Sequence, residues 1–288
     1  MPGVGAALRP RLLSSRLRSL TASAGRRRCQ VWNDGGVDRT FDDLVAEAAA
    51  VSVDGWDFSR LDGRASEERP SWGYARMMGE RMAQASVALD IQTGGGEVLD
   101  GVPKLPARTV ATESWPPNIA QAAKRLHPLG VAVLAHDDEA PLPFAADTFD
   151  LVVCRHPVGV YWPEVARVLR TGGTYFSQEV GPDSVGELTD FFLGPQTPGE
   201  SGREPDLARA DAQAAGLTVT DLRSEPLRTE FRDVGAVIYF LRKVIWIVPG
   251  FTVQRYGAEL RALHDRIAVD GPFEATTRRF LIEAVKAA

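Results

Sequence analysis

The sequence contains few cysteines and no long apolar run. Of its 288 residues only Cys29 and Cys154 are cysteines, which cannot form a disulfide framework or a cysteine-rich metal site. Two isolated thiols suit a reducing compartment, so we expect a cytoplasmic protein and no bound metal. No apolar stretch approaches the roughly 20 residues needed to cross a bilayer, which argues against a membrane-spanning protein.

Acidic residues are missing from residues 1–28, which contain seven arginines. The whole chain carries a net charge of −5, so the part beyond these arginines carries −12. An acid-free, Arg-rich start is typical of a transit peptide, a nucleic-acid-binding arm or a disordered tail, and we favour the tail. The acidic remainder argues against nucleic acid as a partner, because a nucleic-acid-binding face needs a basic stripe.

Strand-like and helix-like segments alternate through the middle of the chain. Apolar strands are predicted at residues 87–90, 109–112, 131–135, 149–154 and 174–177. Helices are predicted at 114–126 and at 162–169, the second ending at Gly172-Gly173. This alternation predicts an α/β fold with a doubly wound, mostly parallel sheet.

The flanking segments are interpreted as additions to that sheet. Helical spacing at 40–53 and 72–82 predicts an N-terminal helical cap over residues 29–86, with an aromatic-bearing loop at 55–63, a polar and charged segment at 64–70, and Trp56 and Trp72 as lid candidates. Residues 87–288 form the sheet domain, with substrate-side insertions at about 182–202 and 231–270. Its later elements are predicted as helices at 206–215, 234–248 and 256–267 and strands at 217–222 and 278–284.

The first predicted strand leads into an acid and then a glycine cluster. Asp90 ends the apolar run, and Gly94-Gly95-Gly96 follow before a helix. Glycines let a backbone approach a ligand and adopt positive φ without a Cβ clash. A carboxylate beside such a turn would repel a phosphate but would attract a cationic ligand with an amino group.

Two further acids follow the next two predicted strands. Glu113 ends one of them, 23 residues after Asp90, and Asp137 or Asp138 follows the other. The carboxyl ends of parallel strands meet at one edge of a sheet, where ligands bind. An acid about 20 residues after the first strand's turn can accept hydrogen bonds from ribose hydroxyls.

The order of these motifs resembles the class I S-adenosylmethionine-dependent methyltransferases, in particular their small-molecule, "type 11"-like members. The resemblance rests on Leu89-Asp90 with the glycines up to Glu97, on Leu142-Pro143-Phe144 before Phe149-Asp150, and on Arg167-Val168-Leu169 before Gly172-Gly173. It is strong over residues 87–180 and looser over 40–285. It implies a Rossmann-like, seven-stranded sheet and an enzyme that methylates a small molecule and releases S-adenosylhomocysteine.

The resemblance also implies where S-adenosylmethionine binds. The glycine stretch would wrap the methionine portion, the acid Glu113 would hold the ribose, and an acid after the third strand would contact the adenine amino group. For that last role the spacing leaves Asp137 and Asp138 open, and we favour Asp138. The predicted cofactor-binding residues are Asp90, Gln92, Thr93, Gly94, Gly96, Glu113, Ser114, Asp137, Asp138, Glu139 and Arg155.

One residue departs from the family pattern. Gln92 stands where the family usually has its first glycine. Its side chain could narrow the pocket, point away from it or hydrogen-bond the cofactor. The three consecutive glycines that follow could compensate for the lost freedom.

The fourth predicted strand ends at Cys154-Arg155-His156-Pro157, on the substrate side of the same edge. His156 is the candidate catalytic base, since imidazole titrates near neutral pH, although a role in lining the pocket or fixing the turn fits as well. Arg155 could steer an anionic substrate or pair with Asp137 or Glu139. Cys154 lies in too apolar a context for a nucleophile.

Three other functions compete with small-molecule methylation. The same cofactor could serve an RNA or protein acceptor, with the arginine tail as the docking arm. A nicotinamide dehydrogenase is disfavoured by Gln92 and by the acid before the glycines. The chain could also be a non-catalytic cofactor-binding or scaffold protein, if Gln92 blocks the pocket. The sequence gives no oligomeric state and no acceptor.

Overall fold

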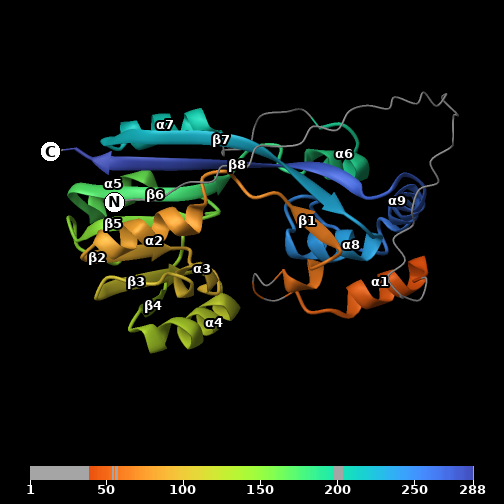
Figure 1. The fold of residues 1–288 in the computed structure, drawn as a ribbon, viewed down its shortest axis with the longest axis horizontal. Coiled ribbons are helices and arrows are strands. Elements are labelled where there is room, and N and C mark those ends of the chain that lie inside the picture. Colours follow the sequence, from red (N-terminus) through yellow and green to blue (C-terminus); the bar gives the residue numbers. More distant parts are fainter. Residues whose placement is uncertain (1–38, 54, 56–57, 197–203, 288) are drawn as a thin grey trace, which may run out of the picture. The chain divides into compact units, whose positions relative to one another are not determined.

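One mixed β-sheet runs through the part of the chain that the computed structural model describes, residues 39–53, 55, 58–196 and 204–287 (Figure 1). The predicted Arg-rich tail lies outside these residues. Within them the sheet has eight strands in the order β1-β7-β8-β6-β5-β2-β3-β4. The strands are β1 (Ala65–Glu67), β2 (Val87–Ile91), β3 (Arg108–Glu113), β4 (Ala132–Ala135), β5 (Phe149–Arg155), β6 (Leu169–Val180), β7 (Leu217–Phe231) and β8 (Phe273–Lys286).

The five strands at one side of this sheet are parallel to one another. β6, β5, β2, β3 and β4 pair in parallel, whereas β8 pairs antiparallel with both β6 and β7. The predicted doubly wound, mostly parallel α/β sheet is therefore confirmed. The predicted number of seven strands is one too few, because β1 adds an eighth by pairing antiparallel with β7.

Nine α-helices connect the described strands or lie beside them. Thr40 caps the first of them, and its hydroxyl accepts a hydrogen bond from the Asp43 N–H. The helices are α1 (Phe41–Ala50), α2 (Tyr74–Gln84), α3 (Glu97–Asp100), α4 (Pro116–Leu126), α5 (Trp162–Val168), α6 (Gly186–Leu193), α7 (Pro205–Ala214), α8 (Val234–Lys243) and α9 (Gly257–Asp270). None of the helices in the described residues is long and apolar enough to cross a membrane.

Both faces of the parallel strands are covered by helices. On one face Val165 of α5 and Ala212 of α7 belong to the same buried cluster as Tyr175 of β6. On the other face Met78 of α2 and Leu126 of α4 share a buried cluster with β-strand residues such as Phe176. Trp72 also belongs to this second cluster and is only 3% exposed, so it packs in the core.

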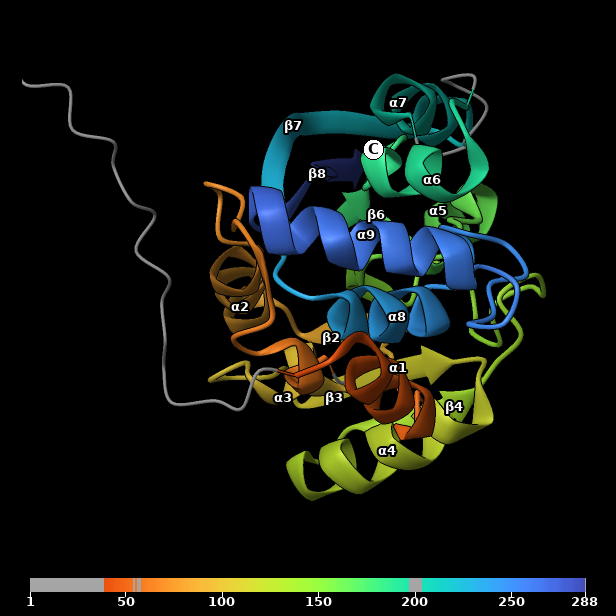
Figure 2. The same ribbon diagram turned by 90° about the vertical axis from the view of Figure 1, so that its right-hand side faces the viewer.

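The far ends of β7 and β8 belong to a third hydrophobic cluster. There Phe231 and Phe273 pack with α1, α6, α8 and α9. Figure 2 shows α8 between α1 and α9. The apolar run predicted as a buried helix is confirmed in α8, although its helix ends at Lys243 rather than at Val248.

One strand was not predicted, and one helix boundary differs from the prediction. Residues 64–70, which are polar and charged, contain β1, which is stabilised by pairing with β7 instead of by its own apolar pattern. The helix expected to stop at Gly172-Gly173 already ends at Val168, and β6 begins at Leu169. A Cβ on Gly173 would meet the Phe149 carbonyl oxygen at 3.0 Å, so this glycine serves a close backbone approach.

The strands β7 and β8 are also much longer than predicted. They pair with each other from Leu217 to Phe231, whereas the sequence suggested only residues 217–222 and 278–284. Charged residues alternate along the added parts, so apolar content alone does not reveal them.

Candidate cofactor site

Acidic side chains gather where β2, β3 and β4 end. β3 pairs in parallel with both neighbours, so Asp90 at the end of β2 and Glu113 at the end of β3 lie on the same edge of the sheet. Asp138 follows β4 by three residues. Asp90 and Glu113 are each only 6% exposed. Two nearly buried carboxylates on neighbouring strands make this edge strongly acidic.

Asp90 is the more perturbed of the two acids. Its pKa is raised to about 7, mainly by burial and to a smaller extent by the negative charge of Glu113, while a hydrogen bond from Thr93 opposes both effects. In that bond the Thr93 hydroxyl donates to Asp90 Oδ2 at 2.6 Å. A positive charge placed beside Asp90 would relieve this cost, because an opposite charge favours the ionised carboxylate.

Glu113 joins the glycine turn to the start of α4. Its Oε2 accepts a hydrogen bond from the Gly94 N–H at 2.8 Å. Its Oε1 accepts from the N–H groups of Ser114 and Trp115 at 3.1 and 3.0 Å. A carboxylate offers about four lone pairs, so these three bonds leave Glu113 with capacity for one more donor.

The glycine turn needs glycine at two positions. Gly94 and Gly96 both have positive φ, 65° and 81°. A Cβ on Gly96 would also meet the Leu126 side chain at 2.9 Å. The turn is tied to the neighbouring strand, since the Thr93 N–H donates to the Thr112 carbonyl at 2.9 Å. These contacts fix the backbone of the turn before any ligand binds.

Gln92 also has a positive φ, 55°, which explains why glycine suits this position. Its side chain reaches the loop between β5 and α5. Gln92 Nε2 donates to the Gly159 carbonyl at 3.0 Å, and Gln92 Oε1 accepts from the Val158 N–H at 2.7 Å. Both polar ends of the amide therefore bind the backbone of this loop.

The structure separates the acids that follow β4. Asp138 lines a cavity and accepts a hydrogen bond from the Ser114 hydroxyl at 2.8 Å. Asp137 is exposed, and its carboxylate accepts from the N–H of Glu139, which is exposed as well. Of the two candidates for an adenine contact, Asp138 is the one that faces the cavity.

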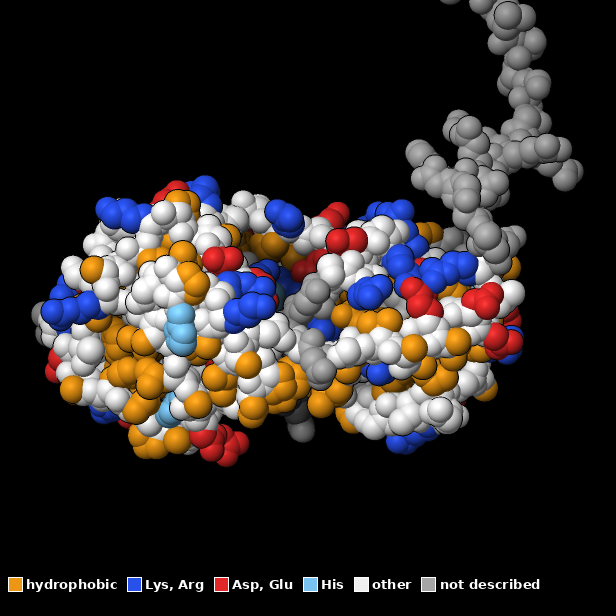
Figure 3. Space-filling view, turned by 90° about the horizontal axis from the view of Figure 1, so that it is seen from below, with side chains coloured by type: hydrophobic (Ala, Val, Ile, Leu, Met, Phe, Trp, Pro, Cys, Tyr) orange, Lys and Arg blue, Asp and Glu red, His pale blue; other side chains and the backbone are white. Residues whose placement is uncertain are grey.

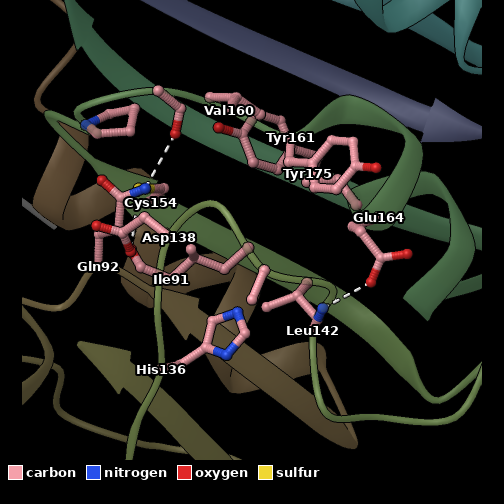
Figure 4. A pocket seen from close by; sticks show the side chains of 14 residues that line it. Ile91, Gln92, His136, Asp138, Leu142, Cys154, Val160, Tyr161, Glu164 and Tyr175 are labelled. Carbon is pink, nitrogen blue, oxygen red and sulfur yellow. Dashed lines mark hydrogen bonds between the residues drawn. The ribbon is translucent and has the colours of Figure 1, made fainter. Parts of the chain in front are cut away.

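The cavity beside these residues has a volume of about 410 Å³, including its opening to solvent (Figure 4). In Figure 4 Gln92 and Asp138 lie towards one end and Glu164 towards the other. The lining comprises Ile91, Gln92, His136, Asp138, Ala140, Leu142, Cys154, Pro157, Gly159, Val160, Tyr161, Glu164, Val165 and Tyr175.

An ion pair on α5 holds the loop that carries Leu142. Glu164 accepts a hydrogen bond from the Leu142 N–H at 2.6 Å and pairs with Arg167 at 2.6 Å. Arg167 in turn donates to the carbonyl oxygens of Phe144 and Leu142 at 2.7 and 2.9 Å. The part played by Glu164 was missed, although its i, i+3 spacing from Arg167 is a signal for it.

His156 lies at the end of a buried polar chain. The Trp72 indole N–H donates to Gln178 Oε1 at 2.8 Å, and Gln178 Nε2 lies 3.0 Å from His156 Nε2. Because indole only donates, Gln178 Oε1 is fixed as an acceptor, and its amide nitrogen donates to His156 Nε2. The neutral imidazole then carries its proton on Nδ1. Sequence patterns gave no sign of Gln178, which is 22 residues from His156.

The two neighbours of His156 differ in their surroundings. Arg155 is exposed, and within the described residues it forms no salt bridge with Asp137 or Glu139. Cys154 is buried, its thiol donates to the Ile91 carbonyl, and burial raises its pKa well above the usual range. A thiol kept protonated in this way is a poor nucleophile, in agreement with the apolar sequence context.

Residues 89–177 match the model of a protein family described as "Methyltransferase domain". This segment contains the glycine turn, the three acids and His156. No curated protein sequence matches the chain.

Solved structures with the same fold share little sequence with this chain. A candidate methyltransferase from Bacillus halodurans is 16% identical, with 75% of this chain and 99% of that one covered and a TM-score of 0.54. The YcgJ protein of Bacillus subtilis is 17% identical, with 75% and 98% covered and a TM-score of 0.52. A Deinococcus radiodurans protein of unknown function is 12% identical, with 79% and 96% covered and a TM-score of 0.55. At such identities the likeness concerns the fold alone.

Proposed function

We propose that this chain binds S-adenosylmethionine at the acidic edge of its sheet and methylates a small molecule, because residues 89–177 match a family model described as "Methyltransferase domain". The observation that supports the proposal best is the placement of Asp90, Glu113 and Asp138 at the ends of three neighbouring parallel strands. A phosphate-bearing cofactor would be repelled by this edge, whereas a cationic nucleoside would be attracted to it.

The chemistry of these residues fits the cofactor. The carboxylate of Asp90 has no cationic partner among its described contacts. We propose that it lies beside the ammonium and sulfonium charges of the cofactor. Glu113 has one acceptor position left for a ribose hydroxyl, and Asp138 would accept from the adenine amino group. Thr93, Gly94 and Gly96 would supply the turn around the methionine portion. Ser114, Asp137, Glu139, Gln92 and Arg155 complete the proposed set of binding residues.

S-adenosylmethionine, when bound, supplies a methyl group already activated by its sulfonium. The residues of the chain then mainly have to orient the acceptor and exclude water. His156 is proposed to act next to the acceptor. To take up a proton at Nε2 it must first release the hydrogen bond from Gln178, so we propose His156 as a base only for acceptors that compete for that nitrogen.

A small-molecule acceptor fits the surface better than a nucleic acid. The face in Figure 3 shows basic side chains interspersed with acidic and apolar ones, without a continuous basic stripe. We propose that the N-terminal cap and the insertions at about 182–202 and 231–270 contribute the acceptor side of the site. The proposed cytoplasmic location rests on the low cysteine content alone.

The experiment is transfer of a radiolabelled methyl group from S-adenosylmethionine, with pools of small amines, phenols and carboxylic acids as acceptors. RNA and protein pools are tested in parallel, with the full chain and with residues 1–28 deleted. Label in small molecules supports the proposal. Label only in RNA or protein contradicts the acceptor class, and cofactor binding without any transfer would leave a binding protein. If His156 is the base, His156→Asn reduces turnover without changing cofactor affinity.

A further inference from the structure

Gln92 has a strained backbone conformation, and the hydrogen bonds of its side chain explain why it is kept there. A residue other than glycine at φ 55° is strained, because its Cβ lies too close to the following carbonyl oxygen. Such strain persists only where surrounding contacts impose it, and it gathers at functional sites. Here the contacts are the two hydrogen bonds from the Gln92 amide to the backbone of Val158 and Gly159.

The loop that Gln92 binds forms one wall of the cavity. Pro157, Gly159, Val160 and Tyr161 all line it. This loop has little packing of its own at the point of contact. The side chain of Val158 is 70% exposed, and the position of a Cβ on Gly159 has no neighbour within 4 Å. Hydrogen bonds must therefore hold this part of the wall.

The base of the loop is held in a similar way. His156 has a φ of 57°, and its N–H donates to the Gln178 carbonyl at 2.7 Å. β2 and β5 pair in parallel, with Ile91 opposite Cys154, so Gln92 lies one residue after this pair on β2 and His156 lies two residues after it on β5. The loop is thus fixed at its start by β6 and at its tip by Gln92.

We propose that Gln92 is a positioning residue that clamps residues 158–159 and keeps this wall of the cofactor site in place before the cofactor binds. The proposal rests on the proposed function for its ligand. It opposes the idea that Gln92 blocks the pocket, since both polar ends of its amide are satisfied by the loop. The two ideas predict opposite effects of glycine at this position.

The clamp itself is tested without any cofactor, by hydrogen exchange of the Val158 amide. Gln92→Gly and Gln92→Ala both remove its acceptor, and each should speed exchange at Val158 roughly tenfold, as expected for the loss of two hydrogen bonds. Asp147→Gly is the matched control, because Asp147 has the same φ of 55° but lies before β5, at the opposite edge of the sheet. It should leave Val158 unchanged.

The consequence for the site is tested by calorimetry with S-adenosylhomocysteine. Both Gln92 variants should bind it roughly tenfold more weakly than the wild type, because the loop must then be ordered on binding. Unchanged exchange at Val158, or equal or tighter binding by Gln92→Gly, would overturn the clamp. If the wild type itself binds no S-adenosylhomocysteine, the proposed function fails, and the exchange result still decides the clamp.

Discussion

The titration of the Asp90 carboxyl group makes the stability of the protein depend on pH. Its pKa of about 7 lies above the value of 3.8 that it has in an unfolded chain. The protonated form is therefore favoured by folding. The resulting contribution to the free energy of unfolding is fully present below about pH 4 and is lost as the pH rises through 7.

Replacing Asp90 with asparagine removes this titration, so comparing the two proteins measures the loss of unfolding free energy. Between pH 5 and 7 the wild type should lose about 1.4 kcal/mol of unfolding free energy per pH unit relative to Asp90→Asn. The asparagine can still accept the hydrogen bond from Thr93. Urea unfolding at several pH values gives the difference. A difference that stays constant over this range would show that Asp90 titrates normally.

Some site residues can be predicted from sequence and others cannot. Asp90, Glu113 and the glycines follow strands at fixed spacings, so local patterns are enough to place them. The bonds of Gln92 to the loop at residues 158–159 and of Trp72 to Gln178 join positions far apart in the chain. Such contacts depend on how the strands lie beside one another, and no local pattern encodes them.

At the scale of elements, α5 lines the cavity through Glu164 and Val165 and also holds a neighbouring loop. Arg167 and Glu164 share one helix and together make three hydrogen bonds to the backbone of the Leu142–Phe144 loop and two to each other. This explains why Leu142-Pro143-Phe144 and Arg167-Val168-Leu169 occur together in the sequence. The short helix is as much a brace for the loop as a cover for the sheet.

Removing the arginine should loosen that brace. Arg167→Ala should lower the free energy of unfolding by about 1–2 kcal/mol, a value reduced for the partial exposure of the side chain. Arg209→Ala serves as the control, since Arg209 meets Asp206 only at 4.0 Å on an exposed surface. It should change stability by less than about 0.5 kcal/mol. Equal effects of the two variants in urea unfolding would contradict the brace.

The elements themselves were predictable only where apolar patterns are strong. The inner strand β5 is buried on both faces and appears in the sequence as a continuous apolar run, Leu151–Cys154. β1 has no apolar pattern and exists through its pairing with β7. The outer halves of β7 and β8 are likewise defined by their partner strand, so their length emerged only from the structure.

At the scale of the whole described chain, one sheet extends from the acidic edge to the third hydrophobic cluster, the one formed with α1, α6, α8 and α9. β7 and β8 take part in the cluster beside the parallel strands through Leu217 and Ile282, and in the cluster of α8 and α9 through Phe231 and Phe273. The sequence predicted the parallel part with its helices on both faces. It did not predict that β7 and β8 would extend into the third hydrophobic cluster.

The central claim is that the acids at this edge hold S-adenosylmethionine, with Glu113 at the ribose. Calorimetry tests it with S-adenosylhomocysteine and with an analogue that lacks both ribose hydroxyls, on the wild type, on Glu113→Ala and on the control Glu97→Ala. Wild type and control should bind the analogue at least roughly tenfold more weakly than S-adenosylhomocysteine, and Glu113→Ala should bind both alike. No binding by the wild type at millimolar concentration, or an undiminished preference in Glu113→Ala, would contradict the claim.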